Sequence, residues 1–213
     1  MEQKKFDSLI FDMDGTLWDA VDTYVKIWNT TYSRLGVEAE ATREQLLQCM
    51  GLPIDSIISR ISPAGLDCRR FTEELRIVDR EILPKDGGTL YPGVAELIPE
   101  LAAEYRLFMV SNCGPDGLDM FLDFTGLRPF FTDTLTNGET HLPKDRNMEI
   151  LISRYALNSP IYIGDTEGDC RSTHAAGIPF MHAAYGFGTA PEADHRGSSF
   201  KEIAEFFLQN SKI

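Results

Sequence analysis

Apolar and polar residues are arranged along the chain with two different spacings. A short apolar run at residues 9–11 comes first and predicts a buried strand. From residue 18 to 84 the apolar residues instead recur every three or four positions, which predicts a block of helices with no convincing strand. The expected helices cover residues 19–35, REQLLQCM after an N-cap at Thr42, DSIISRI and RRFTEELRIVDREIL.

Beyond a turn-rich linker at residues 84–93, predicted strands and helices alternate. The strands are expected at 106–111, 130–136, 160–164 and 179–183, and the helices at 94–104, 116–125, 145–156, 168–176 and 199–209. Such alternation is typical of βαβ units, whose parallel strands form one sheet covered on both faces. The first strand belongs with this sheet. The predicted class is therefore α/β, with a Rossmann-like parallel sheet core formed by residues 1–17 and 86–213 and an all-helical insertion at 18–85.

The composition is that of an ordinary globular protein, because 43% of the 213 residues are hydrophobic and 25% are charged. No apolar run approaches the roughly 18 residues of a membrane span. The N-terminal residues lack the apolar stretch and cleavage site of a signal peptide. The four cysteines form no C-x-x-C pair and are expected to be reduced thiols. We therefore expect a cytoplasmic protein.

The net charge of −13 argues against nucleic acid or an anionic membrane as a partner. A phosphorylated substrate stays compatible with this charge if a metal, a lysine or helix N-termini make the anion site locally positive. We expect a small-molecule partner and a chain that is a monomer or a weak dimer.

Candidate chemistry begins where the first strand ends, at Asp12 and Asp14. Side chains two residues apart on a strand point to the same side, and two neighbouring carboxylates resist ionisation unless a cation or a proton lies between them. In open parallel sheets, ligands bind beyond the carboxyl ends of the strands. The other strand ends are therefore the place to look for the compensating charge.

Polar residues follow the other strands in a matching way. The second strand ends in Ser111 and Asn112, the loop after the third carries Lys144, and the fourth leads into GDTEGD with Asp165 and Asp169. Carboxylate oxygens suit Mg²⁺, and a lysine can neutralise Asp12 and hold an anion. The alternative of an EF-hand loop at DMDGT fails, because the sixth position lacks its glycine and the twelfth its glutamate.

The motifs DMDGT, VSN, PKD and GDTEGD occur in the order found in the haloacid dehalogenase superfamily. The chain resembles the phosphatase branch of that superfamily over essentially its whole length. Residues 18–85 are similar to the helical cap domain of phosphoglycolate phosphatase-like and β-phosphoglucomutase-like members. The third motif departs from the family pattern, because members commonly carry proline after the lysine. Lys85 has a similar context but lies in the predicted linker, so Lys144 is the preferred lysine.

This resemblance implies a role for each residue. Asp12 is the nucleophile that forms an aspartyl-phosphate, and Asp14 acts first as an acid and then as a base. Ser111, Asn112 and Lys144 hold the phosphoryl group. Mg²⁺ is held by Asp12, the backbone carbonyl of Asp14 and Asp165, with Asp169 in support. The implied enzyme is a Mg²⁺-dependent phosphatase acting on a phosphoglycolate-like or sugar-phosphate-like metabolite.

Three alternatives stay open at this point. One is a β-phosphoglucomutase-like phosphotransferase, although mutases of the family often have valine at the position of Thr16. Another is a regulatory module that is phosphorylated on aspartate without turnover. The third is a pseudo-enzyme that only binds a partner, which is disfavoured because every polar member of the site is present.

Overall fold

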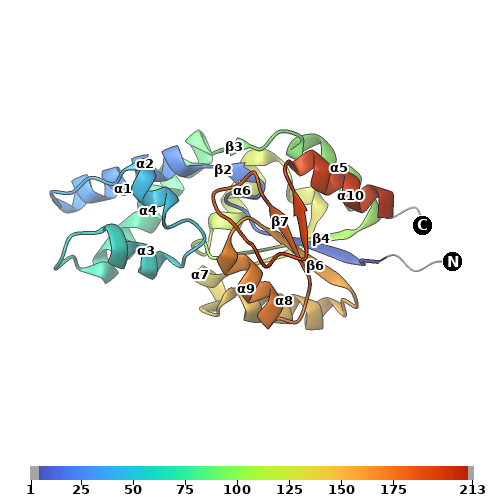
Figure 1. The fold of residues 1–213 in the computed structure, drawn as a ribbon. Coiled ribbons are helices and arrows are strands. Elements are labelled where there is room, and N and C mark those ends of the chain that lie inside the picture. The colour runs from blue at the N-terminus through green and yellow to red at the C-terminus, as the bar shows by residue number, and fades with distance from the viewer. Residues whose placement is uncertain (1–4, 211–213) are drawn as a thin grey trace.

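The larger part of the structure is built on a parallel sheet of six strands in the order β5-β4-β1-β6-β7-β8. The computed structural model describes residues 5–210 (Figure 1). The central strand β1 pairs with β4 on one side and with β6 on the other. The strands are β1 (Ser8–Phe11), β4 (Arg106–Ser111), β5 (Phe131–Thr136), β6 (Pro160–Gly164), β7 (Phe180–Ala183) and β8 (His195–Gly197). The predicted α/β class with a Rossmann-like parallel sheet is confirmed.

Helices cover both faces of this sheet. Successive residues of β1 serve opposite faces, since Leu9 and Phe11 belong to one apolar core and Ile10 to another. Figure 1 shows α8 and α9 below the sheet and α5 and α10 above it. Among the described residues, no helix is both long and apolar enough to span a membrane. The helices are α5 (Val94–Glu104), α6 (Gly117–Thr125), α8 (Lys144–Tyr155), α9 (Glu167–Ala175) and α10 (Phe200–Asn210).

Two short elements of the core were not expected. β8 has three residues and a polar sequence, and α7 (Asn137–Thr140) is a single turn. The turn of α7 is held by a capping box, in which the Thr136 hydroxyl accepts a 3.0 Å hydrogen bond from the Glu139 backbone N–H. Segments this short contain too few residues to show a period.

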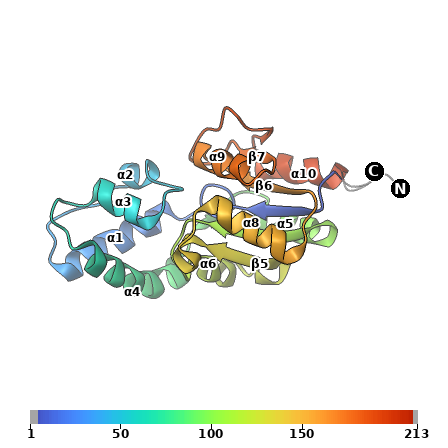
Figure 2. The ribbon, with the colours of Figure 1, turned by 90° about the horizontal axis from the view of Figure 1, so that it is seen from below.

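The described residues between β2 (Trp18–Asp19) and β3 (Thr89–Leu90) form a block of four helices beside the sheet (Figures 1 and 2). Thr42 caps α2 as predicted, and Gly36 ends α1 in the left-handed conformation with φ 66°. Aromatic rings join α1 to α4, with centroids 5.1 Å apart for both Trp28–Phe71 and Tyr32–Phe71. The helices are α1 (Val21–Leu35), α2 (Arg43–Leu47), α3 (Ile54–Ile61) and α4 (Cys68–Asp86).

The connections between this helical block and the sheet differ from the prediction. The chain enters through β2 (Trp18–Asp19) and leaves through β3 (Thr89–Leu90), and these two strands pair antiparallel. The expectation of no strand from residue 18 to 84 is therefore wrong at its first two residues. The expected linker at 84–93 is wrong as well, because α4 continues to Asp86 and β3 follows. The placement of separate domain boundaries after residues 17 and 85 stays a prediction.

Candidate active site

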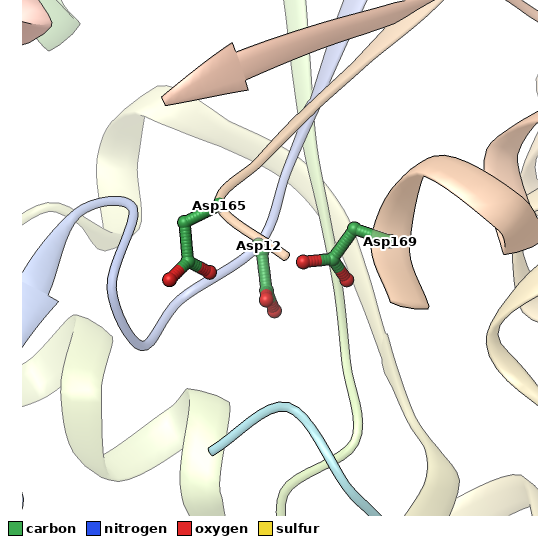
Figure 3. A group of neighbouring side chains, drawn as sticks. All are labelled: Asp12, Asp165 and Asp169. Atoms are coloured by element: carbon green, nitrogen blue, oxygen red, sulfur yellow. The ribbon is translucent and has the colours of Figure 1, made fainter. Parts of the chain in front are cut away.

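Three aspartates meet at the carboxyl end of the sheet. Asp12 follows β1 directly, Asp165 follows β6 directly, and Asp169 lies in the first turn of α9. Each is buried and offers a carboxylate oxygen within 4.8 Å of the others. Figure 3 shows Asp12 between the other two. The structure therefore brings together residues that lie more than 150 positions apart in the sequence, as the strand-end argument expects.

Lys144, at the start of α8, joins this cluster. Its ammonium nitrogen lies 3.1 Å from Oδ2 of Asp12 and 2.5 Å from Oδ1 of Asp169. The residue is the first of α8 rather than part of a loop, and its side chain is only 2% exposed. Burial alone would lower the pKa of Lys144, but the charges of Asp12 and Asp169 outweigh burial and raise this pKa well above its usual value. Lys85 is exposed at the end of α4.

The oxygen atoms of the three aspartates fit a divalent cation. Oδ2 of Asp165 accepts a 2.7 Å hydrogen bond from the Phe187 backbone N–H, while its buried Oδ1 has no hydrogen-bond partner among residues 5–210. An unpartnered buried oxygen is costly unless a ligand satisfies it. Burial, together with the charges of Asp169 and Asp12, raises the pKa of Asp165 well above its usual value. Lys144 supplies one positive charge beside the three carboxyl groups, so a hard divalent cation would neutralise the negative charge that is left.

Asp169 already has protein partners for both of its oxygens. Oδ1 accepts from Lys144, and Oδ2 accepts hydrogen bonds of 3.0 Å and 2.7 Å from the backbone N–H and hydroxyl of Thr166. The second pair forms the capping box of α9. Asp169 is thus placed to orient Lys144 and to support the metal site.

Asp14 lines the same cavity as Asp12 and is hydrogen-bonded to the helical block. Its Oδ1 accepts hydrogen bonds from Trp18 Nε1 at 2.9 Å and from the Tyr24 hydroxyl at 3.0 Å. Burial, and after it the charge of Asp12, raises the pKa of Asp14 to about 7. A carboxyl with a pKa near neutrality can both give and take a proton. The sequence analysis missed Trp18 and Tyr24, since their spacing from Asp14 shows a contact only once β2 and α1 are in place.

A glycine and a second loop complete the surroundings of Asp165. Gly15 has φ +77°, and a Cβ at this position would collide with Oδ2 of Asp165. The loop after β7 supplies the Phe187 N–H. Sequence reasoning missed this loop, because its contribution is a backbone donor and the segment AYGFG carries no charged side chain.

Ser111 and Asn112 stand where β4 ends. Ser111 is buried, and its hydroxyl oxygen accepts a long hydrogen bond of 3.4 Å from the Cys113 backbone N–H. Asn112 donates from its side-chain amide to the carbonyl oxygen of Gly51 at 2.8 Å. The amide expected to bind phosphate is therefore bonded to the helical block in this structure, which leaves the hydroxyl of Ser111 as the group available to a phosphoryl oxygen.

A cavity of about 100 Å³ lies between the sheet and the helical block. Asp12, Asp14, Ser111 and Asn112 line it from the sheet side. The helical block contributes a mostly apolar wall with one carboxyl group, Asp79 of α4. Leu75, Asp79 and Leu83 are spaced four residues apart, so they lie along one face of α4; this spacing was the signal that could have identified Asp79. Only a small molecule fits a cavity of this size.

Comparison with known proteins places these features in a family. A family model described as haloacid dehalogenase-like hydrolase matches residues 9–183. Pyrophosphatase PpaX of Listeria innocua is 30% identical over 174 residues, which are 78% of this chain and 77% of that protein. A phosphoglycolate phosphatase of Synechococcus elongatus is 29% identical over 188 residues, which are 84% of each protein.

The fold is also shared with solved structures. The crystal structure of a predicted phosphoglycolate phosphatase from Haemophilus somnus superimposes with a TM-score of 0.83 at 20% identity, covering 95% of this chain and 98% of that one. The resemblance seen in the four sequence motifs is thereby confirmed. The chain belongs to the haloacid dehalogenase-like hydrolase family.

Proposed function

We propose that this protein is a Mg²⁺-dependent phosphatase that hydrolyses a small phosphorylated metabolite through an aspartyl-phosphate on Asp12. One observation carries the proposal. Asp12 lines the cavity, and its other neighbours are the buried ammonium group of Lys144 and the oxygens of Asp165 and Asp169. The relatives named above support the proposal, since pyrophosphatase and phosphoglycolate phosphatase are names for enzymes that release phosphate.

In the first step, a carboxylate oxygen of Asp12 attacks the phosphorus atom and the bond to the leaving-group oxygen breaks. Asp14 gives its proton to that oxygen, so the leaving group departs as an alcohol. In the second step, Asp14 takes a proton from water, and the resulting hydroxide attacks the phosphorus of the aspartyl-phosphate. Inorganic phosphate leaves, and Asp12 is regenerated as a carboxylate.

The neighbouring side chains stabilise charge during both steps. Lys144 holds Asp12 in place and keeps a positive charge beside the phosphoryl group. The hydroxyl of Ser111 is positioned to donate to a phosphoryl oxygen. Asp12 and Asp165 would hold Mg²⁺, with Asp169 in support, and the bound cation would neutralise charge on the transferring phosphoryl group.

The test uses p-nitrophenyl phosphate, which needs no knowledge of the natural substrate. The protein should release nitrophenolate with Mg²⁺, lose this activity in EDTA and regain it when Mg²⁺ is added in excess. Asp12→Asn should reduce the rate by more than about a thousandfold. Glu149→Gln changes the charge of a half-buried residue on α8 that pairs with Arg146; it is the matched control and should keep the parental rate. Parental turnover by Asp12→Asn would refute the assignment of the nucleophile.

A further inference from the structure

Asp79 is the one carboxyl group that the helical block places in the cavity. It lies in α4 and lines the same space as the nucleophile Asp12. Its neighbours in the wall are apolar and aromatic side chains, among them Trp28, Leu75 and Leu83. Within residues 5–210, Asp79 has no hydrogen bond or ion pair, so its charge is left for something that enters the cavity.

The electrostatic surroundings make this unpaired group unusual. Among the described residues that line the cavity there is no Lys, Arg or His. The ammonium group of Lys144 is already shared by Asp12 and Asp169. Burial, and after it the charge of Asp116, raises the pKa of Asp79 to about 7. A carboxyl group shifted in this way gains free energy when a cation replaces the water that it has lost.

The same wall disfavours an anionic leaving group. A second phosphate or a carboxylate beside the phosphoryl group would lie in a cavity that already contains Asp14 and Asp79. Among residues 5–210, no cationic side chain lines its wall. Like charges in a partly desolvated space repel strongly. Phosphoglycolate and pyrophosphate each carry a second anionic group, which the acidic wall of this cavity would repel. The cavity is therefore unsuited to these two compounds, although relatives of this chain are named after them.

We propose that the leaving group of the substrate carries an ammonium or alkylammonium group, which pairs with the Asp79 carboxylate and packs against the ring of Trp28. This inference rests on the proposed phosphatase function and names its substrate class: the phosphate monoester of a small amino alcohol. The apolar wall then contacts the carbon atoms of the alcohol, and an aromatic face is a favourable surface for an organic cation. Asp79 acts as a specificity residue and takes no part in the chemical steps.

Pairs of substrates that differ only in charge test the inference. Phosphoethanolamine is compared with n-propyl phosphate, and phosphocholine with 3,3-dimethylbutyl phosphate, because each neutral ester has nearly the shape of its cationic partner. Phosphoglycolate represents the anionic class. Phosphate release with Mg²⁺ at pH 8 gives kcat/KM for the parent, for Asp79→Asn and for Glu73→Gln. Glu73 is exposed on the same helix, so its variant is matched in charge change but does not alter the cavity.

The parent should prefer at least one cationic ester over its neutral partner by about tenfold or more. Asp79→Asn should reduce this ratio to about one and raise the relative rate with phosphoglycolate, while Glu73→Gln keeps the parental ratio. An equal rate for both members of each pair, or a preference of the parent for phosphoglycolate, would overturn the inference.

Binding distinguishes a failure of this inference from a failure of the proposed function. Calorimetric titration of Asp12→Asn, and of the double variant with Asp79→Asn, measures the dissociation constants of the same esters without turnover. A cationic preference that depends on Asp79 would support the substrate class even if p-nitrophenyl phosphate were not hydrolysed. Equal dissociation constants for cationic and neutral esters in the Asp12→Asn protein would overturn it, whatever the outcome with p-nitrophenyl phosphate.

Discussion

The hydroxyl of Tyr24 in α1 donates a 3.0 Å hydrogen bond to Oδ1 of Asp14, so the helical block directly contacts the carboxyl group next to the proposed nucleophile. Trp18 donates to the same oxygen at 2.9 Å. An asparagine at position 14 keeps an oxygen that can accept both bonds. Asp14→Asn therefore removes the proton chemistry of this residue while preserving its contacts.

With p-nitrophenyl phosphate, Asp14→Asn should phosphorylate Asp12 and then stall. Nitrophenolate departs without a proton, whereas attack of water on the aspartyl-phosphate requires a base. Rapid mixing should show a burst of about one nitrophenolate per site, and acid-quenched protein should carry a phosphate that hydroxylamine releases. An alkyl phosphate should give no burst. If Asp14→Asn turned over both substrates steadily, a group other than Asp14 would carry out the proton transfers.

Replacing Lys144 should affect both activity and stability. The variant Lys144→Ala leaves Asp12 and Asp169 buried without their shared cation, which should destabilise the fold by about 3–5 kcal/mol. Turnover of p-nitrophenyl phosphate should fall by orders of magnitude, because the positive charge beside the phosphoryl group is lost. Lys85→Ala is the matched control, and urea denaturation together with the rate assay should show little change. A larger effect at Lys85 would contradict the assignment of the third motif.

Gly15→Ala should specifically damage the metal site. The new Cβ would collide with Oδ2 of Asp165, and φ +77° adds backbone strain of about 1 kcal/mol. The Mg²⁺ concentration that gives half-maximal activity should rise by about tenfold or more. Gly36→Ala separates the two effects, because Gly36 has φ +66° with nothing within 4 Å of an added Cβ. The Mg²⁺ dependence of Gly36→Ala should match that of the parent. If Gly15→Ala and Gly36→Ala lost Mg²⁺ affinity equally, backbone strain alone would explain the effect.

Asp79→Asn should change how stability depends on pH. The pKa of Asp79 in the folded protein is about 7, above the 3.8 of a free carboxyl, so the folded state holds the proton more tightly. The stability contributed by the protonated form is present at low pH and is lost as the pH rises toward 7. At pH 8 the free energy of unfolding of the variant should therefore exceed that of the parent by about 1–3 kcal/mol, which raises its melting temperature, and the difference should shrink toward pH 4. Glu73→Gln should show no such trend. If Asp79→Asn and the parent had the same melting temperature at pH 8, Asp79 would be solvated and its pKa would not be raised.

Strong periodic patterns allowed much of the fold to be predicted from the sequence. The strands at 106–111 and 160–164 and the helix at 94–104 have the predicted bounds, because each is long enough for its apolar residues to show a period. β2 and β3 escaped prediction because a two-residue strand has no period. Their pairing depends on a partner that lies 70 residues away along the chain.

The candidate site was predictable where a charged side chain marks a strand end. The carboxyl ends of parallel strands lie at one edge of the sheet, which brings together four charged residues: Asp12, Lys144, Asp165 and Asp169. The donor at Phe187 was not predictable, since any residue supplies a backbone N–H. Asp79 was not singled out either, because a lone carboxylate in a helix is usually solvated. The chemical roles assigned to all these residues stay predictions.

The paired strands β2 and β3 have a mechanical consequence. Both crossings between the helical block and the sheet lie side by side, so the block is attached along a single edge. Away from these two strands, the bond from Asn112 to Gly51 and the ion pair between Arg80 and Asp116 also join the block to the sheet side. The hydrogen bond from Tyr24 to Asp14 is a third contact between the block and the sheet side. We expect any movement of the helical block away from the sheet to break these three contacts, so substitutions at residues that do not touch the phosphate, such as Arg80, should alter the rate of product release.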